Sequence, residues 1–84
     1  MMDEKMTKRC QEAADLSAEF VEWLIANGHE DEAQKIGTGP DDFQMMDSAL
    51  FPEFGKRRGV VKVTAELPPE GWEGTGPTIK VNKD

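Results

Sequence analysis

Between Met6 and Ile25 the apolar positions recur with the period of a helix. Wound at about 100° per residue, they fall on one side, and acidic residues fall on the other. The apolar side holds Met6, Cys10, Ala13, Ser17, Phe20, Val21, Leu24 and Ile25. The acidic side holds Glu12, Asp15, Glu19 and Glu22. Asn27-Gly28 follows as a helix stop signal, so the pattern predicts one long amphipathic helix as the spine of the fold.

Two short helices are predicted in the middle of the chain. Residues 30–36 begin with acids and end with a lysine, the charge order that the helix dipole favours. Residues 43–50 follow a pair of aspartates suited to capping, and Pro52 is expected to end this helix. Its inner face is expected to hold Phe43, Met46 and Leu50. Residues 55–59, which run from glycine to glycine, are predicted to form a linker.

After this linker the period of the apolar pattern changes to that of a strand. In residues 60–67 apolar residues alternate with polar or charged ones, which is typical of a half-buried strand. The side expected to face the core holds Val61, Val63, Ala65 and Leu67. Residues 68–77 are rich in Pro and Gly, and residues 78–81 alternate again. An antiparallel β-hairpin with a wide loop is therefore predicted.

The predicted elements form a single α+β domain over residues 1–84, with a helical part in 1–54 and a hairpin in 59–82. In element order the chain resembles the winged-helix family, which implies that the third helix reads DNA and that the hairpin is the wing. Asp47 and the aspartates before it would meet phosphates with the wrong charge. The plainer alternative is a two-layer domain with the hairpin laid over the helices.

The composition describes an acidic chain without the means to form a disulfide. The formal net charge is −7, and one Cys and one His are present. Phosphate backbones repel such a chain, which argues against direct nucleic-acid binding. A lone Cys with a lone His builds no structural zinc site, so no metal and no cofactor are expected. Neither a leader nor a membrane span is evident, and a reduced cytoplasmic location is expected.

No arrangement typical of an active site is found in the sequence. His29 has no paired Ser or Cys nucleophile and is expected to be a polar residue in an interhelical turn. Cys10 lies on the apolar side of the long helix and is expected to be a small core residue. The chain is therefore expected not to be an enzyme.

Two sets of residues are candidates for binding a protein partner. The acidic set is Glu12, Asp15, Glu19, Glu22, Glu30, Asp31, Glu32, Asp41 and Asp42. Regularly spaced carboxylates on a rigid helix can imitate a phosphate backbone, and the alternative is an ordinary solvated face. The second set is Trp72, Lys56, Arg57 and Arg58. The alternative for the basic run is a solvated linker that neutralises acids on the first or second helix. The alternative for Trp72 is a side chain folded under the hairpin.

The leading hypothesis is a small acidic binding protein that acts by protein–protein contact. In size and charge it is similar to small phage-encoded inhibitors of host nucleic-acid-handling complexes, including anti-CRISPR proteins and DNA mimics. That similarity implies a partner that handles nucleic acid, although no motif points to one family. One alternative is a winged-helix-like DNA-binding regulator that uses the basic run. The other is an oligomeric structural or assembly subunit, such as a homodimer joined through the hairpin edges.

Overall fold

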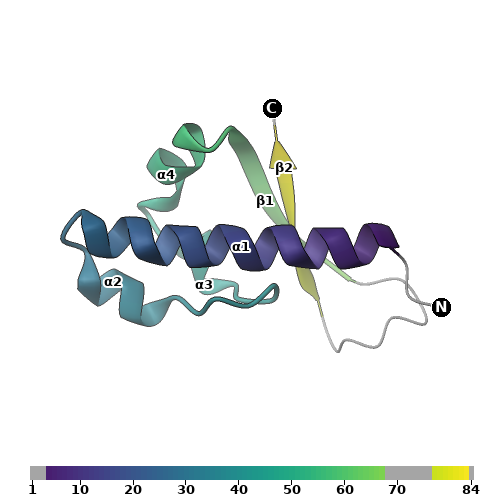
Figure 1. Cartoon of the computed structure of the whole chain (residues 1–84), viewed down its shortest axis with the longest axis horizontal. Helices are drawn as coiled ribbons and strands as arrows, with labels where there is room; N and C mark the ends of the chain where they lie inside the picture. The colour runs from purple at the N-terminus through teal and green to yellow at the C-terminus, as the bar shows by residue number, and fades with distance from the viewer. Residues whose placement is uncertain (1–3, 68–76, 84) are drawn as a thin grey trace.

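The structure, a computed structural model, describes residues 4–67 and 77–83. In chain order it contains α1 (Glu4–Ala26), α2 (Glu30–Lys35), α3 (Gln44–Asp47), α4 (Phe51–Arg57), β1 (Val60–Glu66) and β2 (Thr78–Lys83). The α+β class, the long N-terminal helix and the C-terminal antiparallel hairpin are thus confirmed. α1 runs along the longest dimension of the molecule, with α2 on one side and the hairpin crossing it (Figure 1).

α1 is the predicted spine, and its inner face is largely the predicted one. Phe20 and Leu24 are fully buried, since the helical period brings them to the same side. Leu16 is also buried, although the apolar pattern placed it outside this face. Cys10 is only half-buried, and Ile25 is 50% exposed, contrary to the prediction that both lie in the core. Ile25 is exposed because the six-residue α2 leaves an open groove beside it.

The turn after α1 depends on Gly28. Its φ of 81° lies in the left-handed region that favours glycine. This conformation lets the N–H of His29 donate to the carbonyl of Leu24 at 2.7 Å, which caps the end of the helix. α2 can then begin at Glu30 and fold back along α1.

The helix predicted over residues 43–50 is too long, because α3 covers only Gln44–Asp47 and a further helix, α4, begins at Phe51. α3 is one turn with Phe43 at its N-cap, and the carboxylate of Asp42 in the preceding turn accepts the N–H of Gln44 at 3.0 Å. Pro52 lies in the first turn of α4 instead of ending a helix. The first turn has no intrahelical partner for a backbone N–H, so a proline is well tolerated there. The predicted linker over residues 55–59 is therefore mostly the C-terminal half of α4, and Gly59 (φ 71°) makes the turn into β1.

α4 contributes the aromatic half of the core. The ring of Phe20 lies 5.2 Å from that of Phe51 and 5.1 Å from that of Phe54, measured between centroids. Trp23 also packs on Phe54, at 5.8 Å. Offset and edge-on contacts of this kind add to the free energy gained by burying the rings. Phe51 and Phe54 thus close the core over α1 from a helix.

The hairpin has a bulge that changes which residues of β1 face the core. Val60 pairs with Lys83 and Lys62 pairs with Asn82, so Val61 is an extra residue between them. One extra residue reverses the alternation, and Val60 is buried while Val61 is 68% exposed. Leu67 follows the end of β1 and is 78% exposed. The prediction that Val61 and Leu67 face the core is therefore wrong, Ala65 is exposed as well, and only Val63 of the predicted set is half-buried.

Candidate protein-binding surface

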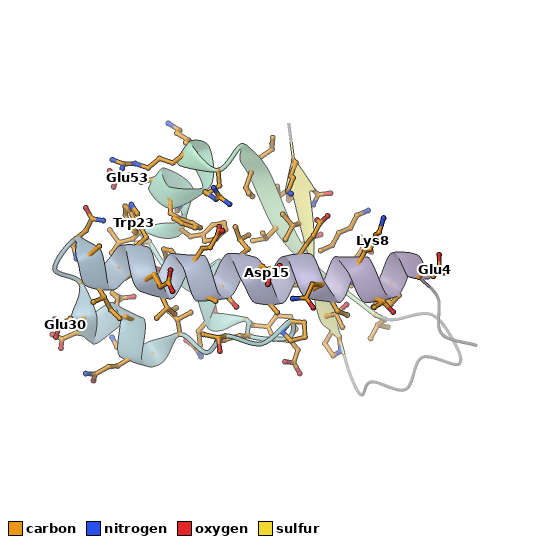
Figure 2. All side chains as sticks on the ribbon, in the orientation of Figure 1. Glu4, Lys8, Asp15, Trp23, Glu30 and Glu53 are labelled. Atoms are coloured by element: carbon orange, nitrogen blue, oxygen red, sulfur yellow. The ribbon has the colours of Figure 1, made fainter. Side chains whose placement is uncertain are left out.

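Three of the four predicted carboxylates on α1 are exposed. Glu12, Asp15 and Glu22 lie outside the buried face of the helix, and Glu12 and Asp15 also border the hairpin. Figure 2 shows Asp15 near the middle of α1 and Glu30 at the end of the molecule where α2 begins. Glu30 and Asp31 are exposed as well. We refer to Glu12, Asp15, Glu22, Glu30 and Asp31 as the open acidic face.

The residues of the open acidic face have no basic partner among the described residues. The ion pairs that the described part of the chain contains involve other carboxylates, namely Glu19, Glu32 and Glu66. Asp15 accepts a hydrogen bond from the side-chain amide of Gln11 at 2.9 Å, a neutral donor that leaves its charge in place. The face therefore keeps its negative potential, which is the property that attracts a basic partner.

Glu19 differs from the other acids of α1 because it is bound by Arg58. The Nε of Arg58 lies 2.8 Å from one carboxylate oxygen of Glu19, and its Nη2 lies 2.8 Å from the other. This paired geometry uses both oxygens of the carboxylate. The sequence placed Glu19 among the acidic candidates for partner binding, but Arg58 already occupies its carboxylate. The alternative reading of the basic run, that it neutralises an acid on the first helix, is confirmed for Arg58.

The basic run does not form one patch. Arg58 holds Glu19, whereas the guanidinium of Arg57 lies 6.0 Å above the ring of Trp23, in a cation–π contact. Lys56 is exposed and has no ion-pair partner among the described residues. The helical twist of α4 separates the three side chains, which the linker prediction did not anticipate.

The remaining acidic candidates divide between surface and interior. Asp41 is exposed, but one oxygen of Asp42 is buried beside Gly37 and the other accepts the N–H of Gln44. Glu32 pairs with Lys35 at 3.6 Å. Asp42 is therefore a structural residue, and Glu32 is partly neutralised. Trp72, the aromatic candidate, lies outside the described residues.

A pocket of about 190 Å³ lies between α1 and the hairpin. Its lining consists of Glu12, Asp15, Leu16, Glu19, Arg58, Val60, Val81 and Lys83. The lining combines carboxylates of α1, the cations Arg58 and Lys83, and aliphatic side chains. The sequence analysis missed Lys83 and Val81, because only the folding of the hairpin onto α1 brings them to this place. The pocket borders the open acidic face and gives a partner side chain a recess.

Arg9 forms a second charged cluster, which the sequence did not indicate. Its side chain is 18% exposed and lies 3.3 Å from Glu66, and it also donates to the hydroxyl of Thr78. Lys80 lies 3.7 Å from the other carboxylate oxygen of Glu66. These contacts fasten the start of α1 to both strands of the hairpin. Arg9 and Lys80 are thereby paired within the chain.

The candidates for chemistry are separated from one another. His29 is exposed, and its ring lies 6.4 Å from that of Trp23 at an angle of 27°. Cys10 is half-buried on α1 and lies more than three helical turns before Trp23. In the described part of the chain, no group of three or more His, Cys, Asp or Glu side chains is arranged to hold a metal ion. None of the described helices combines the length and apolar character that crossing a membrane requires.

Comparison with known proteins gives no relative for this chain. No protein-family model, no curated protein and no solved structure matches it.

Proposed function

We propose that the chain is a non-enzymatic protein that binds a basic partner surface through its open acidic face. The observation that carries the proposal is the exposure of Glu12, Asp15 and Glu22 on a long helix, without a basic partner in the described residues. Other carboxylates of this small fold do find such partners, as Glu19 and Glu66 show. The contrast leaves one side of α1 available for an external partner.

The rigidity of α1 supports this role. Its inner face is anchored by fully buried Phe20 and Leu24, so the carboxylates on its outer face are held in fixed positions along one rod. Asp15 and Glu22 are separated by two turns, about 10 Å along the axis. A preorganised surface loses little conformational entropy on binding, and a concentrated charge speeds encounter with an oppositely charged surface.

The partner class that fits this face is a protein that itself binds nucleic acid, in the cytoplasm. Such proteins present lysine and arginine side chains spaced for phosphates, and a rod of carboxylates competes for the same side chains. The size and net charge of −7 suit a phage-type inhibitor of this kind of host complex. The DNA-reading alternative gains no support, because α3 is a single turn and offers no helix long enough to lie in a groove.

Capture of partners from nuclease-treated bacterial lysate tests the proposal. The face variant, Asp15→Asn with Glu22→Gln, removes two charges from the open acidic face. The control variant, Asp47→Asn with Glu53→Gln, removes two charges from exposed residues of α3 and α4. We expect the wild type and the control variant to retain a nucleic-acid-binding protein that duplex DNA displaces, and the face variant to lose it. Equal capture by both variants, or capture that DNA does not compete, would refute the proposal.

A further inference from the structure

The two outer edges of the hairpin differ in their backbone hydrogen bonds. On β2, the N–H of Ile79 points away from β1 and donates to the carbonyl of Pro40 at 3.0 Å. Ala65 lies opposite Ile79, so these two residues form a pair without mutual hydrogen bonds. The N–H and C=O of Ala65 therefore point outward from β1. The alternation of an antiparallel ladder gives Val63, opposite Val81, the same orientation.

The outer edge of β1 has no partner within the described residues. No backbone hydrogen bond beyond the hairpin involves Val61, Val63 or Ala65 there. α1 packs on β2, and α4 approaches β1 at Val60, next to the turn. Two of the most exposed large apolar side chains, Val61 and Leu67, lie at the two ends of this edge. An edge with outward N–H and C=O groups and apolar ends is a template for a further strand.

We infer that this edge pairs with β1 of a second copy of the chain, which joins two hairpins into one antiparallel sheet. The pairing has a two-fold axis at Thr64. Lys62 then lies opposite Glu66 of the second copy, and Val63 lies opposite Ala65 of the second copy. Lys62 has no ion-pair partner among the described residues, and opposite charges facing each other across strands stabilise a sheet. In this register Lys62 joins the Glu66 carboxylate that Arg9 and Lys80 contact within its own copy. A symmetric interface of this kind is the commonest form of homodimer.

The charge pattern of β1 selects this register over its neighbours. The outward backbone N–H and C=O groups of one copy must face those of the other, so the pairing register can shift only by two residues. One such shift places Lys62 opposite Thr64, and the other places Glu66 opposite Thr64, so each loses the pairing of unlike charges. Only the register centred on Thr64 pairs Lys62 with Glu66 twice, once on each side of the axis. The inference is independent of the proposed function, because it uses no residue of the open acidic face.

Sedimentation equilibrium over a wide range of protein concentration tests the pairing. We expect a reversible dimer for the wild type. Ala65→Pro removes an outward N–H that the hairpin does not use, and proline is tolerated at such edge positions. It should give a monomer with an unchanged circular dichroism spectrum, while Ala65→Val, which keeps the N–H, should remain dimeric. A monomeric wild type at every concentration, or a folded Ala65→Pro protein that still dimerises, would overturn the inference.

A cross-linking experiment tests the register itself and does not depend on the proline variant. In a Cys10→Ser background, Thr64→Cys places two sulfurs across the axis, where Cα atoms in a pair without hydrogen bonds lie about 4.5 Å apart. Disulfides span such distances. Lys62→Cys is the control, since the two copies of residue 62 lie about 14 Å apart in this register. We expect mild oxidation to cross-link the first variant only. Equal cross-linking of both variants, or none of either, would contradict the register.

Discussion

Arg9 connects elements that are distant in the sequence. It lies near the start of α1, yet its guanidinium contacts the carboxylate of Glu66 on β1 and the hydroxyl of Thr78 on β2. It also donates to the carbonyl of Glu66 at 3.4 Å. Arg9 thus joins the start of α1 to both strands, so the orientation of the hairpin on α1 depends in part on one largely buried side chain.

Replacing Arg9 by alanine should therefore destabilise the fold. The loss of charged hydrogen bonds at a largely buried site corresponds to about 1–3 kcal/mol of unfolding free energy. The neighbouring Lys8 is exposed, so Lys8→Ala should change the unfolding free energy by less than about 0.5 kcal/mol. Urea denaturation followed by circular dichroism measures both. An Arg9→Ala protein as stable as the wild type would show that the cluster does not hold the hairpin.

Glu19 provides the opposite case, a close ion pair of small expected consequence. Its side chain is 42% exposed and that of Arg58 is 52% exposed, so water and salt screen the pair. Glu19→Gln should lower the unfolding free energy by less than about 1 kcal/mol. Because this carboxylate is already bound, the substitution should also leave partner capture unchanged. Loss of capture in Glu19→Gln, with unchanged stability, would place Glu19 in the binding face after all.

At the scale of elements, α4 completes the core although it is only seven residues long. Phe51 and Phe54 are both buried and lie against Phe20 of α1. At the end of the same helix Arg57 contacts Trp23, and Arg58, the C-cap residue that follows it, contacts Glu19. One element thus links the aromatic core to the charge distribution at the surface.

Phe54→Ala tests the place of α4 in the core. The ring is 3% exposed, and its removal leaves a cavity between α1 and α4. We expect a loss of about 3–5 kcal/mol of unfolding free energy, enough to unfold much of a domain of this size. Lys56→Ala, at an exposed position of the same helix, should have almost no effect. Equal and small effects of the two substitutions, measured by chemical denaturation, would mean that α4 is a loosely attached segment.

Gly28→Ala tests the turn between α1 and α2. A Cβ at Gly28 meets no atom within 4 Å, so any cost arises from the φ of 81° and not from crowding. The left-handed conformation costs about 1–2 kcal/mol for a residue with a side chain. Gly28→Asn should cost less, because asparagine tolerates this conformation. The thermal midpoint should be highest for the wild type, lower for Gly28→Asn and lowest for Gly28→Ala. A different order would show that the positive φ at Gly28 does not determine the cost of substitution.

The sequence predicted the elements that depend on local periodicity and missed those that depend on distant contacts. α1 follows from its spacing of apolar residues and from Gly28. Pro52 was ambiguous, because a proline both ends one helix and suits the first turn of the next. Alternation alone does not reveal a bulge, so the orientation of Val61 was not predictable. The ion pair between Glu19 and Arg58 joins residues 39 positions apart, and only the packed fold brings them together.

At the scale of the whole molecule, the charges are separated in space. Arg9, Arg58 and Lys80 are held by carboxylates on or near the hairpin, while the outer side of α1 and the start of α2 keep unpaired acids among the described residues. This separation gives a chain with a net charge of −7 one strongly negative side. A basic partner can therefore bind these carboxylates without breaking the ion pairs that stabilise the fold.

The most direct test is the dissociation constant of a captured partner for three proteins at one ionic strength. These are the wild type, the face variant (Asp15→Asn with Glu22→Gln) and the control variant (Asp47→Asn with Glu53→Gln). If the outer side of α1 is the docking surface, the face variant should bind about 10-fold more weakly or worse, a loss of about 1.4 kcal/mol, and the control variant should match the wild type. Equal weakening of both variants would assign the effect to net charge alone, and no weakening of either would remove α1 from the interface.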